Sequence, residues 1–396
     1  MNKIIFVLIL VPTMVFGQNK VNFNQGEIEQ NKFCDTIPFE FIKDKIILKV
    51  KIGGSFKRFI FDTGNTLAIS EEIQNIMKNP ILDSVIQTDV LGAKKKINSV
   101  KVREFELGHL KFTDVPAVVT NVKESGFLTC FDYHGFIGSN ALRNCILQID
   151  LRKKYLIITN EISKLELQNF HKTDLRLDKQ SGPNLKVKIG KKIEFEALFD
   201  SGSDEFLSIS NEIYNKIEKK KLSKTTNEGF GITTVAMHGT EKQATKKRVS
   251  IQSVDFDNFA IQNTVSVISS HNTGNAFGLK LAEYGIITID YINKQFYFQP
   301  FLPIQEFKDK TTIGFTLMPE ENSIKIGVVW SNTQAAKLGL KSGYKILKLN
   351  QIDLTRRTPQ SDCELFLTQP TKGKSVELTY QDENNEVKTV KLEQEF

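Results

Sequence analysis

The sequence predicts a mainly β protein, with two copies of one β unit followed by a separate α+β unit. Three observations support this class. Apolar and charged residues alternate in short segments such as residues 48–52 and 193–197, which is typical of strands with one solvent-exposed face. Four short blocks recur in the same order in two parts of the chain. The 29 phenylalanines suit sheets that pack face to face.

The two copies are expected at residues 36–160 and 174–302, joined by a polar linker near residues 168–182. A Lys-Val-Lys-Ile-Gly block stands at residues 49–53 and again at 186–190. Phe-Asp-Thr-Gly at residues 61–64 then corresponds to Phe-Asp-Ser-Gly at residues 199–202. A short helix with a serine N-cap, Ser70 or Ser210, is predicted after each motif. A β-hairpin, at residues 146–158 or 286–298, ends each copy.

A third unit is expected over residues 311–396. Strand patterns at residues 324–330 and 343–350 flank a short helix that ends at Gly339. This arrangement differs from that of the duplicated unit and predicts an appended α+β domain.

Residues 1–17 are predicted to be a signal peptide. A cationic start with Lys3 precedes about thirteen mostly apolar residues, which suit a signal-peptide core and are too few for a membrane-spanning helix. An uncleaved anchor is the alternative interpretation. No later segment is long and apolar enough to span a membrane, so we expect an exported protein, periplasmic or secreted.

The formal net charge of +7 does not indicate a nucleic-acid partner. The lysine runs at residues 94–96 and 219–221 are not interleaved with aromatic residues, as a surface for single-stranded nucleic acid would be. We interpret these runs as solvated strand ends and helix faces. The alternative is that they are weakly attracted to anionic envelope surfaces.

The four cysteines are too few for a disulfide-built scaffold. Cys130 and Cys145 could pair, or Cys34 could reach either, so the pairing stays open. Cys145 and Cys363 are each expected to be buried thiols.

Asp62 and Asp200 are the candidate catalytic residues, because each ends an apolar strand at the equivalent place of its copy. If the copies pair about a pseudo-twofold axis, the two carboxyls meet there and hold one proton between them. The ionised member can then take a proton from water while the protonated member donates to a carbonyl oxygen. This chemistry needs no metal or cofactor.

The duplicated motif resembles the aspartic proteases, in particular bacterial exported proteins with two retropepsin-like or pepsin-like β-barrel lobes in one chain. The resemblance covers residues 36–302 and implies that Asp62 and Asp200 form the catalytic dyad. It further implies that four neighbouring residues support the dyad, namely Thr63, Gly64, Ser201 and Gly202. The flaps that close over a bound peptide would lie around Gly92 and Gly231. The chain departs from the family pattern at Asn65-Thr66 and Ser203-Asp204. The Asp204 carboxyl either raises the pKa values of the pair by repulsion or points into solvent.

The third unit resembles the PDZ domains of bacterial envelope proteases, through Ala335-Ala336, Gly339-Leu340 and the strand that follows. Tyr344 and Gln351 differ from the residues that are usual at these positions of the motif, which are Asp and Gly. The resemblance implies a loop that holds a peptide C-terminal carboxylate, formed by Ile313, Gly314, Phe315 and Thr316. A packing domain without a ligand is the alternative.

The sequence thus predicts an aspartic endopeptidase that acts on peptide or protein substrates and binds peptide C-termini through its PDZ domain. One alternative is a catalytically silent peptide-binding or scaffolding protein that keeps the protease fold. Another is a peptidase of narrow specificity for one envelope partner.

Overall fold

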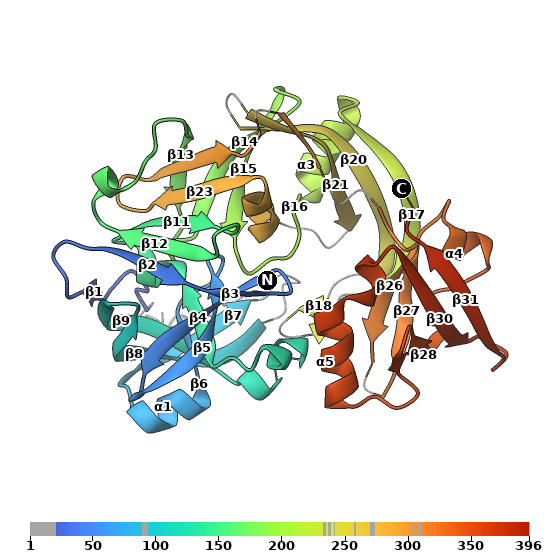
Figure 1. Cartoon of the computed structure of the whole chain (residues 1–396), viewed down its shortest axis with the longest axis horizontal. Helices are drawn as coiled ribbons and strands as arrows, with labels where there is room; N and C mark the ends of the chain where they lie inside the picture. The colour runs from blue at the N-terminus through green and yellow to red at the C-terminus, as the bar shows by residue number, and fades with distance from the viewer. Residues whose placement is uncertain are drawn as a thin grey trace, which may run out of the picture.

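The computed structural model describes residues 21–88, 94–124, 126–232, 235–236, 239–240, 242–256, 259–269, 274–302, 304–307, 311–320 and 322–395. Within these residues the chain is mainly β and forms three large sheets (Figure 1). The predicted signal peptide lies outside the described residues. No helix in the described ranges combines the length and apolar character needed to cross a membrane.

The N-terminal sheet has nine strands among the described residues, at the lower left of Figure 1. Its strands are β1 (Glu27–Ile28), β3 (Glu40–Ile42), β4 (Lys45–Ile52), β5 (Ser55–Asp62), β6 (Ala68–Ser70), β7 (Ile81–Thr88), β8 (Lys94–Leu107), β9 (Leu110–Thr120) and β10 (Gly135–Gly138). Strand β10 runs parallel to β5 and antiparallel to β6.

The central sheet has fourteen strands among the described residues. They are β2 (Cys34–Pro38), β11 (Ile146–Asp150), β12 (Tyr155–Thr159), β13 (His171–Leu177), β14 (Pro183–Ile189), β15 (Ile193–Asp200), β16 (Leu207–Ser208), β17 (Ser223–Gly231), β20 (Ala244–Phe256), β21 (Phe259–Ser269), β22 (Ala276–Gly278), β23 (Gly285–Asp290), β24 (Gln295–Pro300) and β25 (Ile304–Glu306). Strands β11 and β23, which the sequence predicts at the end of each copy, pair with each other in antiparallel register. This pairing joins the two halves of the chain in one sheet.

The prediction of a linker near residues 168–182 is wrong for residues 171–177. Residues 171–177 form β13, which pairs with both β24 and β14. The strand alternates exposed and half-buried residues, so only Leu175 is fully buried and the apolar pattern is weak.

The C-terminal module, residues 311–395, contains a six-stranded sheet within the described residues. Its strands are β26 (Phe315–Pro319), β27 (Ile324–Val329), β28 (Lys345–Leu349), β29 (Ile352–Asp353), β30 (Ser375–Gln381) and β31 (Val387–Glu393). The module has its own apolar core, which includes Ile326, Leu349 and Leu378. A two-stranded piece, β18 (Val235–Ala236) with β19 (Gly239–Thr240), lies apart from the three sheets.

The helices are short. They are α1 (Glu71–Met77), α2 (Ser139–Leu142), α3 (Asn211–Lys219), α4 (Gln334–Lys337) and α5 (Pro359–Thr368), with 3-10 turns η1 (Val122–Glu124), η2 (Gly126–Phe131), η3 (Ile162–Lys164), η4 (Leu279–Glu283) and η5 (Pro370–Lys372). The predicted N-caps are confirmed, because the Ser70 and Ser210 hydroxyls accept from the backbone N–H of Ile73 and Ile213. Each N-cap places its helix directly after a strand that follows the Asp motif.

Candidate active site

The two motif aspartates occupy equivalent register positions. Asp62 ends β5 and lies opposite Gly138 of the parallel strand β10. Asp200 ends β15 and lies opposite Gly278 of the parallel strand β22. Both side chains are half-buried. The same local pairing therefore presents one carboxyl from each half of the chain.

The turns after the two aspartates are linked by reciprocal hydrogen bonds. The Thr63 N–H donates to the Ser201 hydroxyl (2.9 Å), and the Ser201 N–H donates to the Thr63 hydroxyl (2.9 Å). The Thr63 hydroxyl donates to the Phe199 carbonyl (2.6 Å), and the Ser201 hydroxyl donates to the Phe61 carbonyl (3.2 Å). Thr63 and Ser201 are fully buried, so these bonds satisfy groups that water cannot reach. They hold the two aspartates in one place.

Gly64 and Gly202 leave room for the opposite carboxyl. A Cβ on Gly64 would overlap the Asp200 carboxyl, and a Cβ on Gly202 would overlap that of Asp62. Each glycine N–H also donates to the carboxylate of its own motif, Asp62 (3.0 Å) or Asp200 (2.9 Å). The glycines are thus required by close packing against the facing half of the chain.

The two carboxyls interact directly. Burial, then the charge of Asp200 and a hydrogen bond between the two side chains, raise the pKa of Asp62 well above its ordinary value. The ammonium of Lys45 and the Gly64 N–H act in the opposite direction and do not cancel this rise. The pair therefore retains one proton at a pH where an isolated aspartate would be ionised.

One part of this arrangement is similar to a known protein family. Residues 48–141 match the family model described as aspartyl protease. The chain thus contains an aspartyl-protease-like region, which includes Asp62 and the strands that hold it. No curated protein matches the chain. The basic 7S globulin from soybean is a similar solved structure, at 10% identity and a TM-score of 0.39, covering 68% of this chain and 95% of that one.

Lysines beside the aspartyl-protease-like site were not predicted from the sequence. The side chain of Lys45 is buried, and its ammonium donates to the Gly202 carbonyl. The ammonium of Lys43 lies 3.4 Å from the Asp204 carboxylate. Both lysines belong to the β3–β4 turn and the start of β4, far from Asp204 in sequence. No local motif identifies them, because their role depends on contact with the other half of the chain.

The side chain of Asp204 is 44% exposed, and its carboxylate faces the ammonium of Lys43. Burial opposes its ionisation, but the ammonium groups of four lysines outweigh burial and hold its pKa well below the ordinary value; these are Lys45, Lys43, Lys372 and Lys280. Burial in turn lowers the pKa of Lys43. The largest contributions to the pKa of Asp62 come from burial, Asp200, Lys45 and Gly64, and Asp204 is not among them.

A row of apolar residues crosses the N-terminal sheet at the level of Ile60, two residues before Asp62. Direct cross-strand neighbours link Ile47, Ile60, Phe136, Ala68 and Val118, in that order, across β4, β5, β10, β6 and β9. Alternate residues of a strand share a face, so this row lies on the face that carries the carboxyl of Asp62, two residues after Ile60. All five residues belong to one buried apolar cluster that is distinct from the main core.

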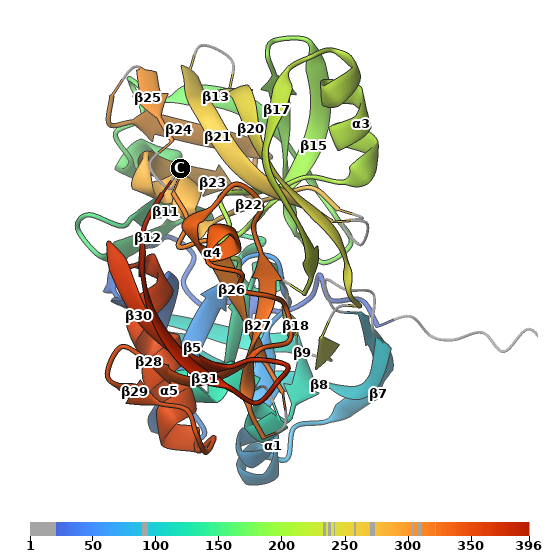
Figure 2. The same cartoon turned by 90° about the vertical axis from the view of Figure 1, so that its right-hand side faces the viewer.

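The two predicted flap glycines have different outcomes. Gly92 lies outside the described residues. Gly231 ends β17, and a Cβ there would overlap the carbonyl of Gly327 in β27. The end of the β17–β20 hairpin therefore packs against the C-terminal module (Figure 2).

Polar and apolar contacts fix β17 on the module. The Glu228 N–H donates to the Ser331 hydroxyl (2.8 Å), and the Ser331 N–H donates to the Glu228 carbonyl (2.7 Å). Val328 and Trp330 are buried although neither belongs to the module's own core, and Val328 lies against Gly229. This contact joins the module to the central sheet.

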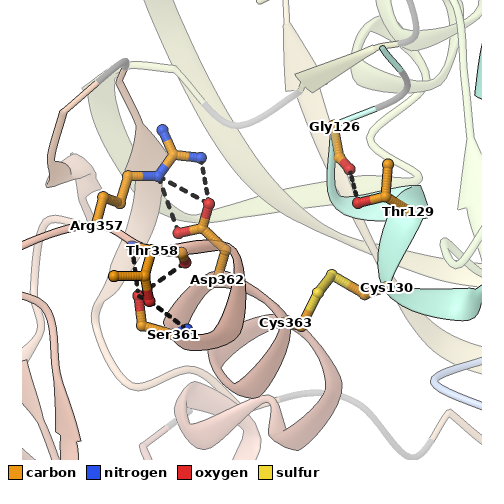
Figure 3. Close-up of a disulfide and its surroundings, with 8 residues drawn as sticks. All are labelled: Gly126, Thr129, Cys130, Arg357, Thr358, Ser361, Asp362 and Cys363. Atoms are coloured by element: carbon orange, nitrogen blue, oxygen red, sulfur yellow. Dashed lines mark hydrogen bonds and ion pairs between the residues drawn. A yellow bond between two sulfur atoms is a disulfide. The ribbon is translucent and has the colours of Figure 1, made fainter. Parts of the chain in front are cut away.

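A disulfide joins the module to the N-terminal half. Cys130 of η2 is bonded to Cys363 of α5 (Figure 3). The expectation that Cys363 is a buried thiol is therefore wrong, and none of the three pairings considered among Cys34, Cys130 and Cys145 occurs. The separation of 233 residues explains why spacing alone does not reveal this bond. The prediction that Cys145 is a buried thiol is confirmed.

Aromatic and ionic contacts surround the disulfide. The Phe366 ring stacks on Phe127 (5.3 Å between centroids) and meets Phe131 edge-on (5.5 Å). The Lys43 ammonium lies 3.9 Å from the centroid of the Phe366 ring. Lys43 thus contacts both the module and Asp204, and it connects the module to the loop that follows Asp200.

The four residues expected to hold a peptide carboxylate, Ile313 to Thr316, lie just before and at the start of β26. Ile313 is buried, and Gly314 has a positive φ of 92°. Phe315 and Thr316 begin β26, whose only sheet neighbour among the described strands is β27. The Thr316 hydroxyl donates to the Ile232 carbonyl, which follows β17 (3.2 Å).

Within the described residues, no group of three or more His, Cys, Asp and Glu side chains is arranged to hold a metal ion.

Proposed function

We propose that the protein is an aspartic endopeptidase in which Asp62, Asp200 and one water molecule hydrolyse peptide bonds. The observation that carries the proposal is the contact of the two carboxyls between turns cross-linked by Thr63 and Ser201. The ionised carboxyl removes a proton from water, and the resulting hydroxyl attacks the substrate carbonyl. The protonated carboxyl donates its proton to the carbonyl oxygen. The carboxyl that took the proton from water then delivers it to the leaving amine, and the other carboxyl recovers a proton from the tetrahedral diol as the C–N bond breaks.

The proposal treats residues 36–160 and 174–302 as two lobes related by a pseudo-twofold axis. The equivalent pairings at Asp62–Gly138 and Asp200–Gly278 support this relation. The reciprocal Thr63 and Ser201 bonds support it as well, because each lobe offers the other the same donors and acceptors.

The module at residues 311–396 is proposed to be a PDZ domain that binds peptide C-termini. The edge position of β26 and the positive φ of Gly314 support this role, since an added peptide strand needs a free edge and a backbone turn for its carboxylate. Removal of residues 1–17 as a signal peptide and export of the chain are part of the proposal, and export permits the Cys130–Cys363 bond.

Asparagine substitutions test the dyad. Asp62→Asn and Asp200→Asn are each expected to reduce cleavage of an unstructured protein by at least about 1,000-fold, because neither can exchange the catalytic proton. Asp178→Asn, a change in the loop before β14, is the matched control and should leave the rate near that of the unmodified protein.

Mass spectrometry of the products and circular dichroism of each variant complete the test. Undiminished turnover in either dyad variant would contradict the assignment. An inactive unmodified protein that still binds C-terminal peptides would instead support the scaffolding alternative.

A further inference from the structure

Tyr291 is a fully buried tyrosine that joins the second half of the chain to the turn after Asp62. It follows β23 directly, and its backbone N–H donates to the carbonyl of Cys145 in the first half (3.2 Å). Its hydroxyl lies 2.9 Å from the hydroxyl of Ser139, the first residue of α2. Ser139 is fully buried as well, so water does not compete for this contact.

The hydrogen bonds of Ser139 run in one direction. The Ser139 hydroxyl donates its single hydrogen to the Thr63 carbonyl (2.7 Å). The Tyr291 hydroxyl is therefore the donor in the contact with Ser139. Burial raises the pKa of Tyr291, so its hydroxyl keeps the proton and remains a donor from acid to neutral pH.

This series of hydrogen bonds ends on the carboxyl of Asp62. The Thr63 carbonyl and the Gly64 N–H belong to one peptide group, and that N–H donates to the Asp62 carboxylate (3.0 Å). A hydrogen bond accepted by the carbonyl of a peptide group polarises the group and strengthens the bond that its N–H donates. The Tyr291 hydroxyl is thus connected to Asp62 through Ser139 and one peptide group.

The two halves of the chain differ at these positions. The residue that matches Ser139 in the second copy is Leu279, and the residue that matches Tyr291 in the first copy is Leu151. A leucine side chain cannot donate a hydrogen bond, so the two turns differ here although the strand pairing around them is equivalent. The series of hydrogen bonds from Tyr291 therefore acts on one aspartate of the pair.

We propose that Tyr291 is a positioning residue of the catalytic pair, which acts on the Asp62 carboxyl through Ser139 and the peptide group between Thr63 and Gly64. This inference rests on the proposed function, since it assigns a role in the same reaction. By orienting the Gly64 N–H, the series of bonds holds the carboxyl in the geometry that proton transfer requires.

Tyr291→Phe removes the hydroxyl and keeps the ring, so it breaks the series at its start. The Gly64 N–H favours the charged form of Asp62, and a weaker bond should raise the pKa of Asp62 further, by about 0.2–0.5 of a pH unit. The alkaline limb of kcat/KM should move to higher pH accordingly, and kcat should fall about 3- to 10-fold with KM nearly unchanged. The charged groups that act on Asp62, Asp200 and Lys45, are the same in the variant.

Tyr214→Phe is the matched control, because it makes the same substitution at a buried tyrosine of α3 whose hydroxyl donates to Glu218 (2.6 Å). It should leave the pH profile unchanged. Ser139→Ala should shift the profile in the same direction as Tyr291→Phe. Adding Tyr291→Phe to Ser139→Ala should have no further effect, since both changes act through one series of bonds.

An NMR titration of protein labelled at its aspartate carboxyl carbons gives a readout that does not need cleavage. The signal of Asp62 is assigned by its absence from Asp62→Asn. An upward shift of this titration in Tyr291→Phe, and not in Tyr214→Phe, supports the inference even if no variant cleaves a peptide. An unchanged titration in a Tyr291→Phe variant that is folded by circular dichroism would overturn it, even if Asp62→Asn abolishes cleavage.

Discussion

Two carboxyls in contact cannot both ionise without strong repulsion, and the residues around Asp62 show how this chain accommodates them. The buried ammonium of Lys45 and the Gly64 N–H favour the charged form, but burial and Asp200 together outweigh them. The pair consequently holds a proton. In the proposed mechanism, that single proton lets one carboxyl act as a base while the other acts as an acid.

This balance predicts the pH dependence of cleavage. Activity should fall as the pH rises through the raised pKa of Asp62, because the pair then loses its shared proton. It should also fall in strong acid, where both carboxyls become protonated. The profile of kcat/KM against pH measures both limbs, and a rate that keeps rising into the alkaline range would contradict the assignment.

Stability should change with pH in the same region. Folded Asp62 keeps a proton that the unfolded chain releases, so the free energy of unfolding decreases as pH rises from the ordinary aspartate pKa to the raised one. Asp62→Asn should remove this decrease. Denaturant titrations of the variant and the unmodified protein over that range, with Asp178→Asn as the control, provide the comparison.

At the scale of elements, the site depends on turns that end strands from distant parts of the chain. The residues of the motifs and the helices that follow them were predicted from sequence, because Phe-Asp-Thr/Ser-Gly and the serine N-caps are local patterns. Strand β13 was missed, because a strand with one fully buried residue carries little apolar alternation.

The cross-linked turns give a prediction for Thr63 and Ser201. Thr63→Val removes the hydroxyl that bonds Phe199 and Ser201 and leaves the buried Ser201 N–H without an acceptor. The loss should lower the free energy of unfolding by about 1–3 kcal/mol. Ser201→Ala should have a similar effect, and the double variant should cost less than the sum of the two, since both changes disrupt one network.

Chemical denaturation of the two single variants and the double variant measures the coupling. Thr66→Val, a buried threonine of the first turn that makes no bond to Ser201, is the matched control. Strict additivity of the two single effects would show that the turns are independent.

At the scale of the whole molecule, the C-terminal module holds both halves of the chain. It is bonded to η2 through Cys130–Cys363, and it packs on β17 through Ser331 and Val328. Lys43 connects it with the loop after Asp200. The module therefore belongs to the surroundings of the site and is not packed apart from the two halves.

Removing the disulfide should measurably destabilise the molecule. Cys130→Ala with Cys363→Ala should lower the free energy of unfolding by about 2–5 kcal/mol, because the bond closes a very long loop in the unfolded chain. Cys34→Ala, which removes an exposed free thiol, is the control. Urea unfolding without reductant measures the difference, and equal midpoints for the double variant and the control would contradict the prediction.

The sequence by itself determined the duplicated unit, the strand class, the paired motifs and the type of residue that would carry the chemistry. These features are local or repetitive, so alternation, capping residues and recurring blocks reveal them. The tertiary structure alone decided which distant residues meet near the motifs and the module: Lys45 and Lys43 beside the second motif, Phe23 in the same apolar cluster as Ile60, and Cys130 bonded to Cys363. The physical reason is that each of these contacts joins residues that are distant in the chain, and no spacing along a sequence reports which surfaces folding brings together.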